Sequence, residues 1–331
     1  MPTVIVADNL TKTYILNKKA PGVAGALKAL FRPDKVRIEA VKQVSFTIAE
    51  GELVGFIGPN GAGKTTTLKM LTGILFATGG RADVLGFDPS ERRREMQRQI
   101  ALVMGNKMQL WWDLPAWESF LVLKEIYEVS DAEFKIRIDE LVSILDLSEK
   151  LHTQVRRLSL GERMKCELIA ALLHGPRVLF LDEPTLGLDV VSQKRIREFL
   201  KRHNREHRTT ILLTSHYMQD VAELCERVIV IDHGSLIFDG SLTSLTERFG
   251  PVRRLHLIFR SPVHADMSAF GRVLSSSDTE VVLEVPREQT SAAAAKILEQ
   301  FPVKDIAIED IAIEDVVREL FTREPDTLPA G

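Results

Sequence analysis

Short apolar runs separated by helical patterns organise most of the chain. Strands that are apolar on both faces are predicted at the start of 53–75, over 177–184 and over 209–216. Residues at helical spacing follow each of them. Strands of this kind are typical of a parallel sheet with helices on both sides. A strand, a His-Gly turn and a second strand over 228–240 end the alternation. The pattern predicts an α/β fold.

Two other segments depart from this alternation. Residues 117–127 and 131–145 have helical periodicity without a strand signal, which predicts a helical subdomain over about 106–160. The C-terminal residues combine short apolar strands with an alanine-rich helical stretch and predict a small α/β domain. We therefore expect a first domain over 1–250 and an accessory domain with a short tail over 251–331.

The composition limits the classes of protein to consider. Hydrophobic residues make up 45 % of the 331 residues, enough for a substantial core, and the net charge is only −3. The chain lacks the strong excess of basic residues that indicates binding to nucleic acid, and we expect no nucleic-acid partner. Cys166 and Cys225 lie far apart in helix-like stretches, as expected of buried, reduced thiols in a cytosolic protein.

The sequence predicts neither a secretory signal nor a membrane span. The N-terminal residues lack a basic region that leads into an apolar one, and the apolar runs are far shorter than the roughly 18 to 20 residues a span needs. Residues 18–37 are basic and partly amphipathic, and we predict a loop there. A solvated insertion is one interpretation of this loop, and contact with a membrane surface or a membrane-embedded partner is the other.

A glycine-rich turn after the first core strand matches the phosphate-binding pattern G-x-x-x-x-G-K-[ST] over residues 58–65. Its glycines let backbone amides approach phosphate oxygens, and the helix N-terminus adds its dipole. Lys64 can reach the β- and γ-phosphates, and Thr65 can hold Mg²⁺. The residues expected to bind nucleotide here are Gly58, Asn60, Gly61, Gly63, Lys64, Thr65 and Thr66.

Two acidic residues end the apolar strand over 177–184. Asp182 is placed to orient Mg²⁺ or its waters, and Glu183 is placed to accept a proton from an attacking water. Taken alone, such a pair is more often a helix cap or a solvated turn. The phosphate-binding turn elsewhere in the chain favours the catalytic interpretation.

A short segment before this strand, Leu-Ser-Leu-Gly-Glu over 158–162, opens a helix. Ser159 and Gly161 can offer a hydroxyl, a backbone amide and the helix dipole to an anion. The alternative is that Ser159 only caps its own helix. The pentapeptide by itself does not decide between the two.

Together these motifs resemble the ATPase domains of ABC transporters. GPNGAGKTT, LSLGE, VLFLDEP, the Leu186-Gly187-Leu188-Asp189 segment and the Thr-Ser-His end of the strand over 209–216 occur in the family's order and spacing. The resemblance covers roughly residues 4–248. It implies a P-loop NTPase core of ABC ATPase type with a helical subdomain, which binds ATP and Mg²⁺.

The resemblance also implies that two such domains pair head to tail. Two identical ATPase chains and two different ones fit the sequence equally, and we predict a homodimer. Lys64, Thr65 and Asp182 of one chain would then face Ser159 and Gly161 of the other across each ATP. Closure of this kind excludes water and places fixed donors where phosphoryl charge develops.

Further roles follow from the same resemblance. Glu183 is expected to be the general base and His216 the switch histidine that senses the γ-phosphate, and Lys64 completes the catalytic set. Asp189 is expected to link the two sites, and Tyr14 to stack on adenine.

Two departures from the family pattern stand out. In the segment over 158–162, which corresponds to the family's signature segment, Leu160 and Glu162 replace the common Gly and Gln. Neither residue supplies the main phosphate contacts, so we expect the ATPase activity to be retained. The glutamine-loop position falls at Asn106, whose side chain is one methylene shorter, and Gln109 lies three residues on. Either Asn106 or Gln109 is therefore expected to contact Mg²⁺ or the attacking water.

All three tryptophans lie beside this loop. Trp117 suits packing within the helical subdomain, whereas the adjacent Trp111 and Trp112 cannot both face inward in a regular element. Aromatic anchors are enriched at the centres of interfaces. We therefore expect Trp111 or Trp112, or both, to contact a membrane permease, because the resemblance places the permease cleft at this segment.

The segment over 104–120, with 158–176 and the basic loop, more specifically resembles ATPase subunits of exporters whose permease is of the type-2 class, which are associated with export of drugs, viologens and other amphiphiles. We expect a peripheral protein at the cytoplasmic face of the cell membrane that couples ATP-driven dimer closure to export. The alternative is an ABC ATPase that acts on ribosomes or nucleic acid, although such proteins usually carry two cassettes or a long coiled coil.

Overall fold

The chain divides into two compact units, Met1–Asp239 and Gly240–Gly331. The boundary expected at residue 250 follows helix α9 (Leu242–Phe249), which groups with the C-terminal unit. Within the part of the chain that the structure describes, no helix combines the length and apolar character that crossing a membrane needs. The structure is a computed structural model, and it describes residues 2–18, 34–105, 107–215, 217–250, 252–263, 265–311 and 313–322.

A six-stranded sheet forms the centre of the first unit. From one edge to the other its strands are β5 (Ile100–Met104), β6 (Val178–Asp182), β7 (Thr210–Thr214), β3 (Leu53–Ile57), β8 (Arg227–Asp232) and β9 (Ser235–Ser241). Pairing is parallel from β5 through β8, and every residue of β6 and β7 is buried. The predicted α/β fold with buried parallel strands is confirmed.

A second, three-stranded antiparallel sheet has the order β2 (Asp34–Ala49), β1 (Thr3–Lys18) and β4 (Gly79–Val84). The prediction of a loop over 18–37 is wrong at its ends, because Lys18 belongs to β1 and β2 begins at Asp34. Val36 pairs with Leu16, so the alternating pattern of the strands continues into the segment that was expected to be a loop. Residues 19–33 of that segment lie outside the described residues.

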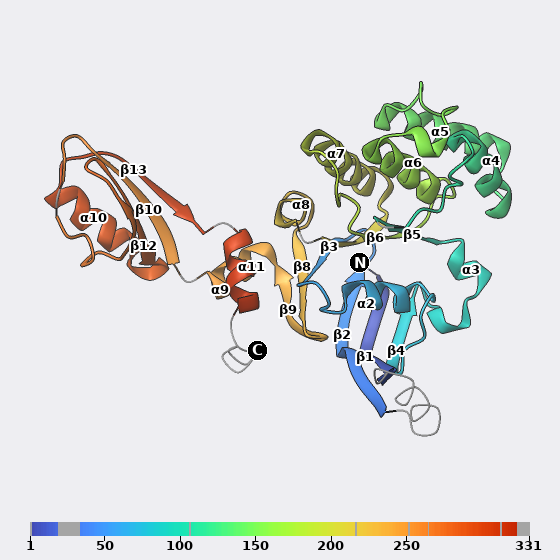
Figure 1. Cartoon of the computed structure of the whole chain (residues 1–331), viewed down its shortest axis with the longest axis horizontal. Coiled ribbons are helices and arrows are strands. Elements are labelled where there is room, and N and C mark those ends of the chain that lie inside the picture. The colour runs from blue at the N-terminus through green and yellow to red at the C-terminus, as the bar shows by residue number, and fades with distance from the viewer. Residues whose placement is uncertain are drawn as a thin grey trace, which may run out of the picture. The chain divides into compact units, whose positions relative to one another are not determined.

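The main core lies between these two sheets and encloses helix α2 (Lys64–Leu71). Phe46 of β2 and Phe56 of β3 approach with ring centroids 5.7 Å apart, and Leu68 and Leu71 of α2 are buried in the same cluster. Figure 1 shows α2 on the side of the six-stranded sheet that faces the antiparallel sheet. The core thereby fixes the helix that follows the phosphate-binding turn.

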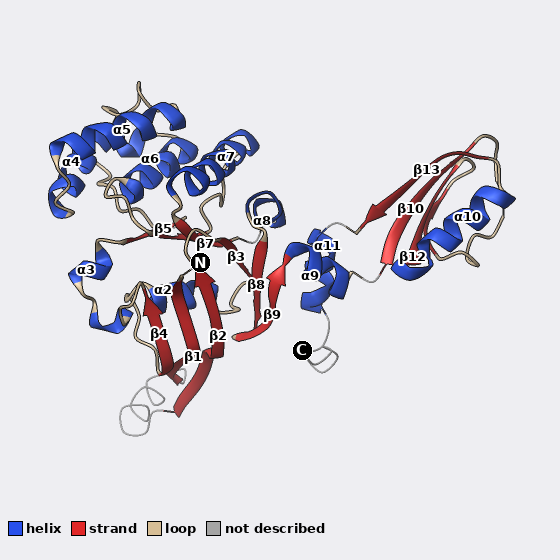
Figure 2. Cartoon of the chain, turned by 180° about the vertical axis from the view of Figure 1, so that it is seen from behind, coloured by secondary structure: helices blue, strands red, loops and turns tan. Residues whose placement is uncertain are grey.

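The helical subdomain covers the other face of the six-stranded sheet (Figures 1 and 2). Its predicted helices over 117–127 and 131–145 correspond to α4 (Ala116–Ile126) and α5 (Asp131–Leu145). In the described part of the first unit, further helical elements are η1 (Pro89–Glu91), α3 (Arg94–Gln97), η2 (Val155–Arg157), α6 (Leu160–Leu172), α7 (Val190–His207) and α8 (Met218–Leu224).

The C-terminal unit contains a four-stranded antiparallel sheet. Its strands, in spatial order, are β11 (Arg272–Ser276), β12 (Glu280–Pro286), β10 (Val252–Phe259) and β13 (Val303–Asp310). Helix α10 (Thr290–Gln300), which follows η3 (Arg287–Gln289), packs Ile297 against Leu255 and Leu283 of the sheet. Helix α11 (Ile313–Thr322) packs against α9. A folded α/β unit therefore occupies this region.

Candidate nucleotide-binding site

The turn over 58–63 joins β3 to α2 and is built so closely that side chains are excluded at two positions. A Cβ atom at Gly58 would lie 2.2 Å from the carbonyl oxygen of Ile231. Gly63 has a φ of 105°, and its Cβ would lie 2.4 Å from the carbonyl oxygen of Ala40. Asn60 and Gly61 form the exposed tip of the turn. Backbone amides at this helix start are therefore presented without side chains in front of them.

Lys64 lies at the base of this turn and is almost fully buried. Its ammonium group donates hydrogen bonds to the carbonyl oxygens of Gly58, at 2.6 Å, and Pro59, at 3.0 Å. Burial lowers the pKa of Lys64, and the nearby Glu183 and Asp182 carboxylates partly oppose that shift. The ammonium thus lies inside the loop where phosphate oxygens are expected.

The hydroxyl of Thr65 and the carboxylate of Asp182 meet beside the ammonium. Thr65 Oγ1 donates to Asp182 Oδ2 at 2.8 Å and lies 3.0 Å from Oδ1. The hydroxyl of Thr214 also donates to Asp182 Oδ1, at 2.7 Å. A hydroxyl and a carboxylate are the hard oxygen ligands that Mg²⁺ prefers, so the predicted residues fit this ion. Thr66, the next residue of α2, is half-buried.

Glu183 follows Asp182 in a strained backbone conformation, with a φ of 55°. Its amide lies 3.1 Å from both the carbonyl oxygen and the hydroxyl oxygen of Thr214, which ties it to β7. Gly105 packs so closely that a Cβ there would lie 2.3 Å from the carbonyl oxygen of Glu183. The sequence pattern did not single out Gly105, and it marked Thr214 only as part of a strand end, because their contacts with Glu183 come from neighbouring strands.

The two candidates for the glutamine loop are placed differently. Asn106 lies outside the described residues, as does His216. Gln109 is held by α6, because its side-chain amide donates to the carbonyl oxygen of Glu167 at 3.2 Å. The buried Glu167 carboxylate also accepts the backbone amides of Gln109 and Leu110, and burial raises its pKa. Glu167, a buried carboxylate on α6, therefore positions this segment, and no sequence motif marks it.

The segment over 158–162 starts α6. Ser159 caps this helix, since its hydroxyl accepts the amide of Glu162 while the Glu162 carboxylate accepts the amide of Ser159. The capping alternative is therefore observed, and it leaves the exposed helix start available for a second role. A Cβ at Gly161 would lie 2.5 Å from the hydroxyl oxygen of Ser192, which in turn donates to Asp189 at 2.6 Å. Asp189 caps α7, so the N-termini of α6 and α7 pack against each other.

This signature segment and the phosphate-binding turn belong to opposite layers. α6 and α7 cover one face of the six-stranded sheet and α2 lies on the other (Figures 1 and 2). Tyr14, the expected adenine contact, is half-buried on β1, and the Lys12 ammonium lies 5.4 Å from its ring centroid.

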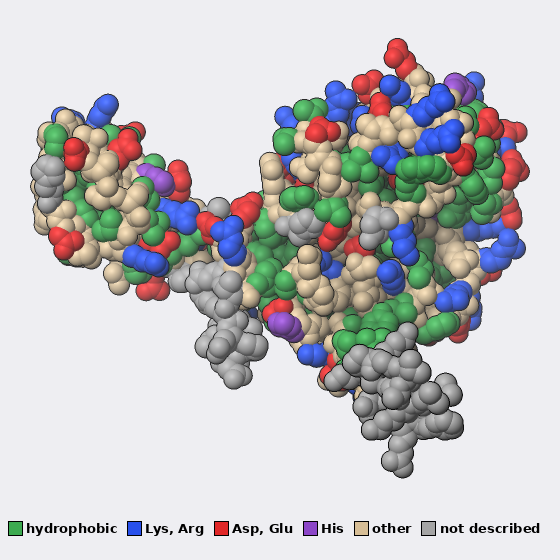
Figure 3. Space-filling model, viewed as in Figure 1, with side chains coloured by type: hydrophobic (Ala, Val, Ile, Leu, Met, Phe, Trp, Pro, Cys, Tyr) green, Lys and Arg blue, Asp and Glu red, His purple; other side chains and the backbone are tan. Residues whose placement is uncertain are grey.

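The tryptophans divide as the sequence predicts. Trp111 and Trp112 are 42 % and 48 % exposed, and the guanidinium of Arg163 lies 5.1 Å from the Trp112 ring centroid. Trp117 instead packs within the subdomain, with ring centroids 5.8 Å from Phe134. Figure 3 shows hydrophobic and basic side chains side by side over the helical subdomain.

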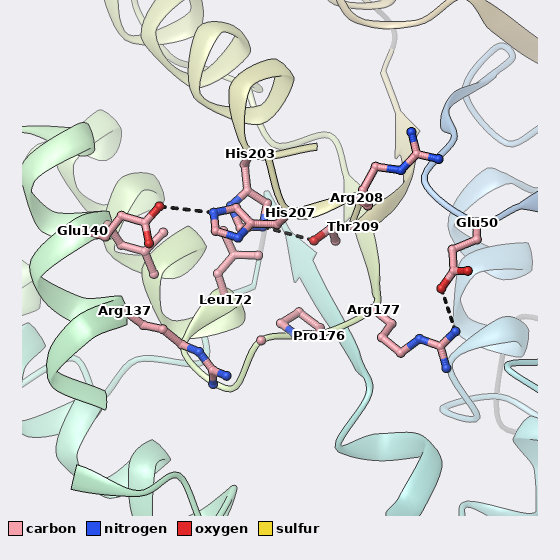
Figure 4. Close-up of a pocket in the computed structure, with 12 residues that line it drawn as sticks. Glu50, Arg137, Glu140, Leu172, Pro176, Arg177, His203, His207, Arg208 and Thr209 are labelled. Atoms are coloured by element: carbon pink, nitrogen blue, oxygen red, sulfur yellow. Dashed lines mark hydrogen bonds and ion pairs between the residues drawn. The ribbon is translucent and has the colours of Figure 1, made fainter. Parts of the chain in front are cut away.

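Two of the hollows beside the helical subdomain differ in whether predicted site residues line them. One, of about 470 Å³, is lined by residues that include Met104, Gln109 and Tyr127 and so lies next to the glutamine loop. The other, of about 300 Å³, lies between α5 and α7 (Figure 4), where His207 Nε2 lies 3.1 Å from Glu140 Oε1. None of the predicted site residues that the structure describes lines this second pocket.

Comparison with known proteins gives matches over both units. The family model described as "ABC transporter" matches residues 41–186, and that of the C-terminal domain of EvrA-like ABC transporters matches residues 251–309. The ABC transporter ATP-binding protein NatA of Bacillus subtilis is 37 % identical over 66 % of this chain and 88 % of its own length. The linearmycin resistance ATP-binding protein LnrL of the same organism is 35 % identical over 63 % of this chain and 67 % of its own length.

Solved structures give the same fold. The structure of an ATP-binding subunit of an ABC transporter matches with a TM-score of 0.61 and 23 % identity, over 75 % of this chain and 93 % of that one. The dimeric structure of an ATP-binding cassette in a post-hydrolysis state, bound to ADP and Pi, matches with a TM-score of 0.59 and 25 % identity, over 72 % of this chain and 98 % of that one.

Proposed function

This chain belongs to the ABC transporter ATP-binding proteins and is an ATPase of that family, and we propose that it couples ATP hydrolysis to export through a separate membrane permease. The observation that carries the proposal is the meeting of the Thr65 hydroxyl with the Asp182 carboxylate beside the buried Lys64 ammonium. This arrangement supplies both a cation for phosphate and oxygen ligands for Mg²⁺.

We propose the following division of labour for hydrolysis. The amides of the turn over 58–63 and Lys64 hold the phosphates, while Thr65 and Asp182 hold Mg²⁺, with Asn106 or Gln109 as a further ligand. When bound, the ion neutralises charge that develops on the phosphate oxygens. Glu183 orients a water and accepts its proton, and His216 contacts the γ-phosphate. The strained conformation of Glu183 supports an active role, because such strain concentrates at functional sites.

We propose that a second, identical chain completes each site. Ser159 and Gly161 stand at the start of α6, which lies in the layer opposite α2 (Figures 1 and 2), and this placement supports coverage of the phosphate-binding turn by a partner's copy of the segment. Asp189 caps the helix beside Gly161 and is placed to link the two sites, and Tyr14 stacks on adenine. A solved cassette of this fold is dimeric, which supports the same assembly here.

We propose that a permease of the type-2 class docks at Trp111 and Trp112. Two large exposed aromatic side chains, adjacent in the sequence, offer anchors of the kind that dominate interfaces. The word "resistance" in the name of LnrL supports export rather than uptake. The chain would then lie at the cytoplasmic face of the membrane as a peripheral subunit.

The test is isolation of the tagged chain from native membranes in mild detergent, with mass spectrometry of every chain that co-purifies. We expect a polytopic permease in stoichiometric amount, and loss of that permease when Trp111 and Trp112 are both replaced by Ala. Recovery of ribosomal proteins or nucleic acid without a membrane protein would refute the export proposal.

A further inference from the structure

A buried carboxylate joins the turns that follow two central strands. Asp220 lies on α8 and has no exposed surface. Its Oδ2 atom accepts a short hydrogen bond from the hydroxyl of Thr185 and lies 3.1 Å from the hydroxyl oxygen of Ser215. Glu183 follows the last residue of β6, and Thr185 comes two residues later. Ser215 follows the last residue of β7.

A third element reaches the same carboxylate from α7. Arg197 is 3 % exposed, and its Nη1 donates to Asp220 Oδ1 at 2.8 Å while its Nε donates to Glu223 at 2.7 Å. A buried carboxylate is costly unless a charge and hydrogen bonds compensate it. Here the guanidinium supplies the charge, and the two hydroxyl groups occupy the other oxygen atom.

The hydrogen bonds extend from the carboxylate into the backbone of both turns. The amide of Tyr217 donates to the hydroxyl oxygen of Ser215 at 2.9 Å, so the residues on either side of position 216 are tied to Asp220. The amide of Leu188 donates to the carbonyl oxygen of Thr185 at 3.2 Å, which closes the turn after Glu183. Both turns therefore have a common fixed point.

We propose that Asp220 is a positioning residue of the ATPase, which holds the turn carrying Glu183 in one fixed relation to Ser215 and Tyr217 after β7. The inference rests on the proposed function, because it takes Glu183 as the general base. A base displaced by about 1 Å can lose on the order of 10²-fold in rate, so a rigid common support at this point has a kinetic consequence.

A matched pair of substitutions at Thr185 tests this role with little change of shape. Thr185→Val removes the hydroxyl that donates to Asp220, whereas Thr185→Ser keeps a hydroxyl. In steady-state hydrolysis of Mg-ATP by the full chain, we expect Thr185→Val to lower kcat by about 10-fold or more with KM and ATP affinity nearly unchanged. Thr185→Ser should have a kcat within about twofold of the kcat of the unmodified chain.

Thr290→Val is the control for loss of a buried hydroxyl as such. The Thr290 hydroxyl is buried in the C-terminal unit and donates to the carbonyl oxygen of Pro286 at 3.0 Å. Its removal should leave kcat unchanged, even if it lowers the melting temperature as much as Thr185→Val does. A parallel fall of kcat and melting temperature in both Val variants would overturn the positioning role.

A double-substitution experiment tests whether both turns act through one carboxylate. Ser215→Ala alone should also lower kcat, and Thr185→Val combined with Ser215→Ala should lower it by less than the product of the single effects. If the effects multiply, or if Thr185→Val keeps full kcat while folded, the inference fails. Asp220→Asn should show the largest loss, and the Thr185 pair decides the matter if that variant does not fold.

Failure of the proposed function gives a different result. If Glu183→Gln hydrolyses ATP at nearly the normal rate, Glu183 is not the base and both proposals fall together. If Glu183→Gln abolishes hydrolysis but Thr185→Val does not slow it, only the positioning role of Asp220 is refuted.

Discussion

Thr65 donates its hydroxyl to Asp182 at 2.8 Å, although 117 residues separate the two in the sequence. The bond joins the first turn of α2 to the end of β6, so the phosphate-binding turn and the acidic strand form one site. Both side chains supply oxygen to the same small volume next to Lys64. Their separate roles therefore depend on each other.

The first prediction concerns that oxygen pair. Thr65→Val removes the hydroxyl but keeps the shape, so Mg²⁺-dependent binding of a fluorescent ATP analogue should weaken by roughly 10-fold or more. Thr65→Ser should bind within about twofold of the unmodified chain, because a hydroxyl is retained. Titrations with Mg²⁺ and with EDTA measure the effect. Equal losses of affinity in EDTA and in Mg²⁺ would argue against a role in holding the ion.

The second prediction concerns the general base. Glu183→Gln keeps the size of the side chain but cannot accept a proton, so hydrolysis should fall by roughly 10² to 10⁴-fold. ATP affinity should stay nearly unchanged, because the phosphate-binding groups are intact. A phosphate-release assay and an equilibrium binding assay on the same preparation provide the measurement. Near-normal turnover would remove Glu183 as the base.

The third prediction concerns assembly. Because the Glu183→Gln variant retains ATP, it should accumulate as a homodimer in analytical ultracentrifugation when ATP and Mg²⁺ are present and return to monomer without nucleotide. Gly161→Val, which places a bulky side chain against Ser192 at the signature segment, should reduce the dimer fraction at the same ATP affinity. A Glu183→Gln chain that remains monomeric with ATP would contradict the head-to-tail assembly of identical chains.

The fourth prediction concerns pH. Burial, together with the smaller effect of the neighbouring His207, lowers the pKa of His203 to about 4, so this imidazole stays neutral in the folded protein. In the unfolded chain it titrates near 6.5, so between these values the unfolded state binds more protons. The free energy of unfolding should therefore fall as the pH drops from about 6.5 towards 4.

Urea unfolding at a series of pH values measures this dependence. His203→Gln should flatten the curve in that window without removing its slope, because burial also lowers the pKa of His174 to about 4. An unchanged slope in His203→Gln would show that His203 is protonated in the folded protein as readily as in the unfolded one.

The parts of this architecture that depend on local pattern could be predicted from the sequence. The buried strands β6 and β7 and the helices α4 and α5 follow directly from apolar periodicity, and turn chemistry locates the phosphate-binding site. Two adjacent tryptophans also imply an exposed side chain, and both are exposed.

Contacts between distant segments could not be predicted in the same way. Nothing near Glu183 in the sequence indicates that Gly105 packs against its backbone or that Thr214 holds its amide. The extension of β1 and β2 was missed for a related reason. Val36 and Leu16 are apolar but exposed, and only their pairing across the hairpin shows that they are strand residues.

The last prediction compares the three tryptophans. Replacing Trp111 and Trp112 by Ala removes side chains that are 42 % and 48 % exposed, so the melting temperature and the ATPase activity of the isolated chain should change little. Trp117→Ala is the matched control, because its ring packs against Phe134 and its loss should cost about 2 kcal/mol or more of folding free energy. The Trp111 and Trp112 variant should lose the permease in detergent extracts while Trp117→Ala, where folded, retains it. Retention of the permease by the double variant would place the docking surface elsewhere, and unfolding of that variant would show that the pair is part of the core.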